Sequence, residues 1–324
     1  MRCRDRRRWA ARSVWTAGPP WCTPQAVAGL GPRRPRRAKR GGSDMTTIGL
    51  LHPGEMGSMV GAAVRSGGSR VLWAGEGRSA ATRKRATDAG LEDAGSLAAL
   101  VRASEVIVSV CPPAAAAEQA EQVAKLRFAG TYVDGNAVSP ATAREIGGII
   151  EKGGATFVDG GIIGPPPVKP GTTRLYLSGK SAERMAALLT AGPLAAIVVP
   201  GGPGAASTVK MAYASWTKGS AALLLASCAL AAAEGVEESL VREWKISQPE
   251  LSARAESAAK GNSRKAWRFI GEMEEIAATF AAAGLPDDFH KGAAEIYQRM
   301  AIYKEGPAPS FADVLRALTP RRPA

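Results

Sequence analysis

The sequence has few of the residues that bind metals or form disulfides. Its 324 residues include four cysteines and two histidines. Cys3 and Cys22 lie near the N-terminus, while Cys111 and Cys228 are far apart and follow no motif spacing. Because no Cys or His residues stand at ligand spacing, we expect no metal site. The same scarcity favours a reducing, cytoplasmic setting over a disulfide-rich scaffold.

Long apolar runs are also missing. The longest, Gly219–Ala233, consists mostly of Ala and Leu and is flanked by Lys218 and Glu234. It is shorter than the ~20 residues that cross a bilayer. We therefore expect no membrane span, and we interpret the run as part of a buried helix.

Positive charge is concentrated at one end of the chain. Residues 1–44 carry +10 of the formal net charge of +13, and no apolar periodicity runs through them. We expect a disordered basic tail outside the fold, so that any binding of nucleic acid would belong to the tail and not to the folded body. A transit peptide and a secretory or twin-arginine signal are possible origins. We favour upstream sequence before a start at Met45, because the tail lacks an apolar signal core.

The remaining chain divides into two patterns. From residue 45 to about 200, short apolar strand signals alternate with helical segments, which indicates a doubly wound parallel sheet. After the glycine cluster Gly201–Gly204 the pattern is helical to the C-terminus. We therefore predict an α/β fold: a Rossmann-type dinucleotide-binding domain over 45–200, followed by an all-helical substrate and dimerisation domain over 201–324.

The segment Thr46–Ala63 begins this arrangement with a strand, a turn and a helix in that order. Backbone N–H groups at such a helix N-terminus bind the pyrophosphate of a dinucleotide. The glycine fingerprint is incomplete, because His52 occupies the first glycine position, so an ordinary strand–turn–helix connection remains an alternative. On the first interpretation the cofactor contacts are Leu51, His52, Pro53, Gly54, Glu55, Met56 and Gly57.

Four segments together resemble the β-hydroxyacid dehydrogenase and 6-phosphogluconate dehydrogenase superfamily over Met45–Thr319. They are the opening Ile48–Gly57, the substrate segment Asp134–Pro140, the segment Asp159–Gly164 and the lysine segment Gly204–Met211. Their order and spacing agree with the family, and the long helix after residue 204 is similar to a little-characterised subgroup of NAD(P)-binding oxidoreductases. The resemblance implies a homodimer, in which the long helix packs against a second subunit.

The resemblance also assigns roles to residues. Lys210 matches the family's catalytic lysine, and a buried lysine is able to act as general acid and base. Tyr213 stands where the family has asparagine, and it is a second candidate for catalysis; a tyrosine packed in the core is the alternative. The substrate positions are occupied by Asn136, Ala137, Ile163 and Gly164. Apolar Ile163 at a carboxylate-binding position argues against a simple β-hydroxyacid substrate.

The choice of nicotinamide cofactor depends on the residues after the second strand. Glu76 has the spacing of an NAD-type acid, whereas Arg78 and Ser79 form a phosphate-binding helix start. We favour NADP over NAD. Val110, Cys111 and Pro112 follow a later strand and are expected to border the nicotinamide. We interpret Cys111 as a packed residue and not as a nucleophile.

These observations predict an NAD(P)-dependent oxidoreductase that acts on the hydroxyl or carbonyl carbon of a small molecule, with Lys210 as general acid and base. An imine reductase-like activity is the alternative within enzymes. A nucleotide-binding protein without turnover is the alternative outside them. His290 is expected to be structural.

Overall fold

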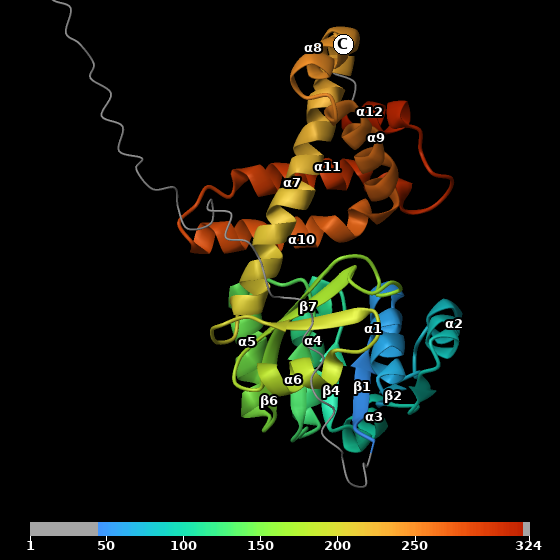
Figure 1. Cartoon of the computed structure of the whole chain (residues 1–324), viewed down its shortest axis with the longest axis vertical. Coiled ribbons are helices and arrows are strands. Elements are labelled where there is room, and N and C mark those ends of the chain that lie inside the picture. Colours follow the sequence, from blue (N-terminus) through green and yellow to red (C-terminus); the bar gives the residue numbers. More distant parts are fainter. Residues whose placement is uncertain (1–44, 320–324) are drawn as a thin grey trace, which may run out of the picture. The chain divides into compact units, whose positions relative to one another are not determined.

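The computed structural model describes residues 45–319, and the predicted basic tail lies outside them (Figure 1). An eight-stranded sheet has helices on both faces, and a helical region follows it along the chain. The predicted fold class, a Rossmann-type sheet domain followed by helices, is therefore confirmed.

The strands lie in the order β3-β2-β1-β4-β5-β6-β7-β8. Their bounds are β1 Thr47–Leu51, β2 Arg70–Trp73, β3 Glu92–Asp93, β4 Val106–Ser109, β5 Thr131–Asp134, β6 Thr156–Ile163, β7 Thr173–Ser178 and β8 Leu194–Val198. The helices of the sheet domain are α1 Glu55–Ser66, α2 Ala80–Asp88, α3 Leu97–Ala103, α4 Ala116–Lys125 with the 3-10 turn η1 Pro113–Ala115 before it, α5 Pro140–Lys152 and α6 Ala182–Leu189.

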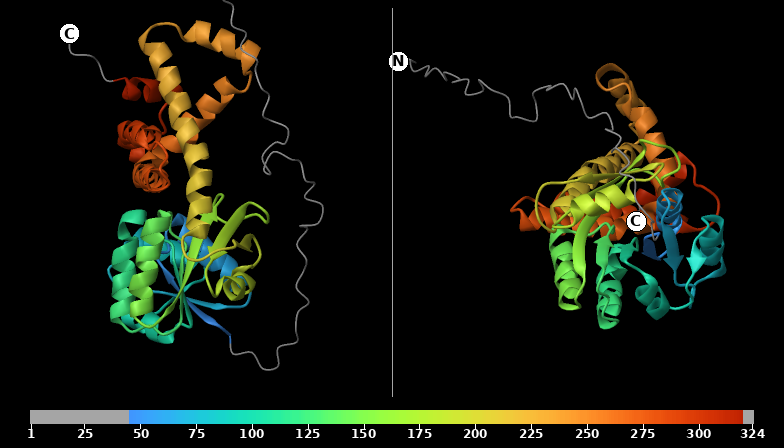
Figure 2. Two further views of the ribbon diagram at one scale, coloured as in Figure 1. Left: turned by 90° about the vertical axis from the view of Figure 1, so that its left-hand side faces the viewer. Right: turned by 60° about the horizontal axis from the view of Figure 1, so that its bottom comes forward.

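Two apolar clusters sandwich the sheet, as strands buried on both faces require. One cluster joins residues such as Ile48 and Val108 to helices α1 and α6. The other joins residues such as Ile107 and Tyr132 to α3, α4 and α5 on the opposite face (Figure 2). Ser139 caps α5, because its hydroxyl accepts a hydrogen bond from Thr142 N (3.1 Å), and Pro140 takes the first helical position.

The sheet is mostly parallel, as predicted, but its last two strands run opposite to the other six. β7 runs antiparallel to β6, with Asp159 opposite Ser178, and β8 is parallel to β7. A parallel connection needs a crossover that usually contains a helix. Residues 164–172 between β6 and β7 contain no helix, so the chain turns straight back. The two-residue edge strand β3 was not predicted either.

The helical region is built around the 29-residue helix α7, Ala205–Ala233. The other elements are α8 Glu237–Ser247, α9 Leu251–Asn262, α10 Ala266–Ala282, α11 Asp288–Met300 and α12 Phe311–Leu318, with 3-10 turns η2 Ser263–Lys265 and η3 Ala301–Lys304. They share an apolar core that includes Leu225, Met273 and Tyr297. His290 packs edge-on against Phe280 in this region, with ring centroids 4.3 Å apart, as its predicted structural role requires.

In the single chain one face of the apolar helix α7 is exposed, and the burial of this face against a second subunit stays a prediction. Trp216, Leu223 and Leu230 are 64–70% exposed, and 28% of the most apolar 18-residue window is buried. By length and hydropathy alone, α7 is the one helix among residues 45–319 that would reach across a membrane. The exposed residues stand seven apart, so they form one stripe along the helix.

A buried carboxylate fixes the start of α7 on the sheet. Asp159 on β6 is fully buried, and its Oδ2 accepts hydrogen bonds from Gly204 N (2.9 Å), Ala206 N (2.9 Å) and Ser207 N (3.1 Å). Ser178 Oγ donates to the same oxygen (2.8 Å), and Ser207 Oγ donates to Oδ1 (2.6 Å). The carboxylate therefore satisfies the free N–H groups of a helix N-terminus from another element.

We predict that Asp159→Ala lowers the free energy of unfolding by about 3 kcal/mol, because several buried donors lose their acceptor at once. Urea denaturation followed by circular dichroism measures the change. Asp88→Ala is the matched control, since Asp88 forms an exposed ion pair with Lys84 (2.8 Å) and is expected to cost less than about 0.5 kcal/mol. Equal stability of the two variants would contradict the prediction.

Candidate functional site

The turn after β1 has the geometry of a phosphate-binding turn. His52 adopts a left-handed conformation (φ 61°), which glycine would adopt at lower cost. A Cβ on Gly57 would lie 2.3 Å from the His52 carbonyl oxygen, whereas a Cβ on Gly54 would meet nothing within 4 Å. The turn is therefore tightly packed against α1 at Gly57 and open to a ligand at Gly54.

The other predicted residues of this turn lie around it. Leu51 and Pro53 are buried, Met56 packs against the sheet core, and Glu55 is exposed as the first residue of α1. Burial and the nearby Arg78 charge lower the pKa of His52 to about 4, so the imidazole is neutral at pH 7. Its Nδ1 is buried and has no hydrogen-bond partner among the described residues.

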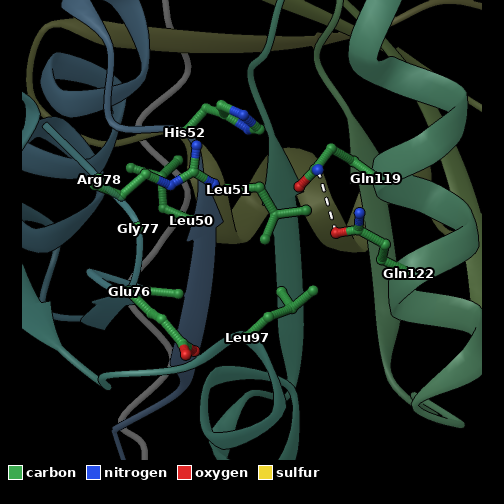
Figure 3. A pocket seen from close by; sticks show the side chains of 10 residues that line it. Leu50, Leu51, His52, Glu76, Gly77, Arg78, Leu97, Gln119 and Gln122 are labelled. Carbon is green, nitrogen blue, oxygen red and sulfur yellow. Dashed lines mark hydrogen bonds between the residues drawn. The ribbon is translucent and has the colours of Figure 1, made fainter.

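A cavity of about 220 Å³ opens beside this turn (Figure 3). Arg78 extends into its His52 end, while Glu76 points toward the Leu97 end. Within residues 45–319, the Arg78 guanidinium takes part in no hydrogen bond or ion pair, so a cation is left free to bind an anionic ligand. The cavity is lined by Leu50, Leu51, His52, Ala74, Glu76, Gly77, Arg78, Leu97, Gln119 and Gln122.

Strand β3, which was not predicted, fixes the loop that carries Arg78 through hydrogen bonds to Asp93. Asp93 Oδ1 accepts hydrogen bonds from Gly75 N (2.9 Å) and Gly95 N (2.8 Å). A Cβ on Gly75 would lie 2.1 Å from the Asp93 carboxylate, so the loop needs glycine at that position. Ser79 then caps α2 by accepting from Thr82 N (3.3 Å). No sequence signal marked Asp93, because a two-residue strand has no periodicity.

The residues after β4 are held by Asn136. Its Oδ1 accepts a hydrogen bond from Cys111 N (2.6 Å), and its Nδ2 donates to Ser109 Oγ (3.1 Å). Val110 lies near Gly57, since a Cβ on that glycine would be 3.6 Å from Val110 Cβ. The Asn136 amide thus joins the ends of β4 and β5, and its binding of substrate stays a prediction.

Two titratable groups near Asn136 are buried. Burial raises the pKa of the Cys111 thiol to about 11, which favours its interpretation as a packed residue. Burial likewise raises the pKa of Asp134 to about 7. Asp134 Oδ1 accepts from Asn136 N (2.9 Å), while Oδ2 has no partner among the described residues. Pro112, the third predicted residue of this segment, is exposed.

Lys210 lies in the second turn of α7, where the helix contacts β6. A Cβ on Gly161 would lie 2.8 Å from Lys210 Cβ and 3.0 Å from the Ala206 carbonyl oxygen, so this glycine lets helix and strand approach. Burial lowers the pKa of the Lys210 ammonium from 10.5 to about 8. The negative charge of Glu272 raises this pKa, and the positive charge of Lys218 lowers it. At pH 7 most of the lysine is therefore still protonated, and on the order of one-tenth is the neutral amine.

The ion pair between Lys218 and Glu272 connects α7 to α10 near Lys210. Both side chains are about 15% exposed. The Lys218 ammonium also lies 4.4 Å from the centre of the Phe269 ring, and the Lys218 carbonyl oxygen accepts from Tyr297 Oη (2.8 Å). The sequence gave no reason to select Glu272, because its partner lies 54 residues away.

The remaining predicted residues lie on both sides of Lys210. Ile163 is two residues beyond Gly161 on β6, so it shares the strand face that meets α7. Gly164 has φ 115°, and a Cβ there would lie 2.1 Å from the Thr172 carbonyl oxygen. The backbone therefore requires glycine at this position. Ala137 packs against the helical core, and Tyr213 is 46% exposed.

The donor set fits a dinucleotide. Three features lie along the carboxyl edge of the sheet, where dinucleotides bind. They are the open turn at Gly54 before α1, the unpaired Arg78 in the adjacent cavity, and the buried amine of Lys210. Among residues 45–319, no three His, Cys, Asp or Glu side chains are grouped as metal ligands.

Comparison with known proteins identifies both parts of the chain. Residues 45–201 match the NAD binding domain of 6-phosphogluconate dehydrogenase, and residues 231–300 match a domain of unknown function, DUF1932. An uncharacterized 28.5 kDa protein in the 7S RNA 5′ region of Methanothermus fervidus is 35% identical over 151 residues, which are 46% of this chain and 57% of the relative. The chain thus spans little more than half the length of that relative.

Solved structures match over most of the chain. A conserved protein of unknown function, described as similar to 3-hydroxyacid dehydrogenases, is 29% identical (TM-score 0.60; 80% of this chain, 98% of that one). A 3-hydroxyisobutyrate dehydrogenase of Mycobacterium tuberculosis is 18% identical (TM-score 0.63; 85% and 99%). A reductive aminase from Aspergillus terreus, in complex with NADPH, is 18% identical (TM-score 0.50; 85% and 100%). The last two show likeness of fold alone.

The fold, the site and these matches define a protein of the NAD(P)-binding oxidoreductase class, with the fold of hydroxyacid dehydrogenases. Residues 45–201 carry the NAD binding domain of the 6-phosphogluconate dehydrogenase type and residues 231–300 the DUF1932 domain, a combination that is consistent with the 6-phosphogluconate dehydrogenase-like superfamily. The predicted resemblance is thereby confirmed.

Proposed function

We propose that the protein is an NAD(P)-dependent oxidoreductase that interconverts a hydroxyl group and a carbonyl group on a small molecule in the cytoplasm. Bound nicotinamide would supply or accept the hydride. Lys210 would take the proton from the substrate hydroxyl, or return it to the carbonyl oxygen, and its ammonium would stabilise negative charge on that oxygen. The observation that carries the proposal is a buried amine with a pKa of about 8 beside the carboxyl end of β6.

The surrounding residues have supporting roles in this proposal. Asn136 holds the end of β4, and with it Cys111, at the nicotinamide side. Ala137, Ile163 and Gly164 form the substrate side, where they offer small or apolar surface. Tyr213 is a second proton donor at the open side of the site. The sheet region 45–200 would bind the cofactor, and the helical region 201–324 would complete the substrate site.

An imine reductase-like activity is the second candidate. It is favoured by Ile163 on the strand face that meets α7. This apolar residue stands where a hydroxyacid would need a polar group for its carboxylate, whereas a cyclic imine has no carboxylate to bind. A screen of hydroxyacids, aldehydes and cyclic imines with both cofactors separates the two candidates by the substrate class that turns over. A protein that binds nucleotide but turns over none of these classes would support the non-catalytic alternative instead.

We predict that Lys210→Ala lowers kcat of the substrate found in that screen by about 10²- to 10⁴-fold, the usual contribution of a general acid or base. Cofactor affinity should stay within about twofold. In the wild type, oxidation should rise with pH through about 8, because the neutral amine is the base; reduction should fall over the same interval, because the ammonium is the acid.

Initial rates and fluorescence titration with NADPH provide the two measurements. Lys152→Ala, which removes an exposed lysine at the end of α5, is the matched control and should leave both unchanged. Full turnover by Lys210→Ala would refute general acid–base catalysis by this residue.

We propose NADP as the preferred cofactor, because the free Arg78 guanidinium lines the cavity beside the phosphate turn. We predict that Arg78→Ala raises KM for NADP by at least about tenfold while KM for NAD changes by less than about threefold, since the arginine would pair with the 2′-phosphate alone. Steady-state kinetics with both cofactors tests this. A wild-type enzyme that strongly prefers NAD would show the assignment to be wrong.

We also propose a homodimer that covers the exposed stripe of Trp216, Leu223 and Leu230 on α7. The wild type should sediment as a dimer at micromolar concentration, and Leu223→Glu should produce a monomer, because a carboxylate would be buried without a partner. Sedimentation velocity measures both, with the exposed residue Phe289 as a control in Phe289→Glu. A monomeric wild type would be the contrary result.

A further inference from the structure

Helix α10 contacts the first residues of two helices of the sheet domain. Arg268 Nη1 lies 2.9 Å from Glu55 Oε2, at the start of α1. One side of the same helix also carries Glu275, whose Oε2 accepts hydrogen bonds from Ser139 N (2.6 Å) and Thr142 Oγ1 (3.0 Å) at the start of α5. Because residues 268 and 275 are seven apart, both project from one face of α10. The helical region is therefore joined to the sheet domain at two helix N-termini.

Glu55 presents an electrostatic conflict at this place. As the first residue of α1, its carboxylate interacts favourably with the positive end of the helix. The same end of the helix is where the pyrophosphate of a dinucleotide binds, and a free carboxylate there would repel it. The Glu55 side chain is only about half exposed, so screening by water would remove only part of its repulsion of a phosphate.

The charges around Glu55 oppose this repulsion. The hydrogen bond from Arg268 is the largest influence that lowers the pKa of Glu55, and the charges of Arg268, Lys265 and Arg85 lower it further. Arg85 is directed toward the same turn, since its Nε lies 3.5 Å from the Pro53 carbonyl oxygen. Among these cations, only Arg268 makes a direct ion pair with Glu55 in the described part of the chain.

We propose that Arg268 is a positioning residue for the cofactor: it holds and neutralises the Glu55 carboxylate so that the phosphate turn accepts a dinucleotide. Binding at the sheet domain then depends on a residue of the helical region, 213 positions away in sequence. The inference rests on the proposed function, because it assumes that this turn binds a nicotinamide dinucleotide.

The test is a double-mutant cycle with NADPH affinity as its readout. Arg268→Ala should weaken binding about fivefold, because it leaves an unpaired carboxylate beside the pyrophosphate. Glu55→Gln combined with Arg268→Ala should return the affinity to within about twofold of wild type, since no carboxylate remains to be neutralised. Arg268→Lys should keep most of the affinity. Fluorescence titration and calorimetry measure binding without any substrate.

Arg316→Ala is the matched control, because it removes an arginine from an exposed ion pair with Asp313 on α12. It should not change the affinity. Equal NADPH affinity of Arg268→Ala and wild type would overturn the inference while leaving the proposed function intact. A double variant as weak as Arg268→Ala would overturn neutralisation as the mechanism. A wild type that binds no nicotinamide nucleotide would overturn both proposals.

Discussion

The buried carboxylate of Asp159 is the interaction on which the rest of the structure depends. It accepts hydrogen bonds from the free N–H groups at the start of α7, and it also accepts one from the Ser178 hydroxyl on the antiparallel strand β7. Lys210 stands on that helix, one turn beyond the capped residues. Glycine at position 161 lets the helix lie against β6. The position of the Lys210 amine therefore follows from the Asp159 cap on α7 and from the absence of a side chain at Gly161. It does not follow from contacts of the lysine itself.

Helix α10 supplies the second constraint. Its charged residues contact the starts of α1 and α5 and pair with Lys218 on α7. These three contacts lie at the start of α1, at the start of α5 and at Lys218 on α7. The sheet region carries the turn after β1 and the adjacent cavity, while the helical region contributes Arg268, Glu272 and Glu275 to the contacts between the two.

Much of the fold was predictable because its signals are local. The start of helix α5, for example, is marked by its own Ser-Pro pair, Ser139 and Pro140, and the alternation of strands and helices over 45–200 is read from short segments. The direction of β7 was not predictable from its composition, because a strand has the same pattern in either direction. Which face of α7 is exposed in the single chain was not predictable for a related reason: alanine and leucine occur on every side of the helix, so the sequence does not mark the side that lacks a neighbour.

The site divides in the same way. The motif residues His52, Arg78 and Lys210 were predictable from spacing and resemblance, and the structure places them along one edge of the sheet. Asp93, Glu272 and Arg268 were not, because their partners are distant in sequence. The hydrogen bond from Cys111 N to the Asn136 amide oxygen was not predictable either, because the two residues are 25 positions apart. Short-range chemistry was therefore visible in the sequence, while long-range pairs needed coordinates.

The Asp159 cap has a consequence for how the chain unfolds. The sheet supplies the acceptor and the helical region supplies the donors, so separating the two would leave each with unmatched polar groups at the former junction. A fragment that ends near residue 200 would expose both the carboxylate and the glycine surface of β6. The two regions should consequently melt in a single cooperative transition, although their sequence patterns suggest two modules.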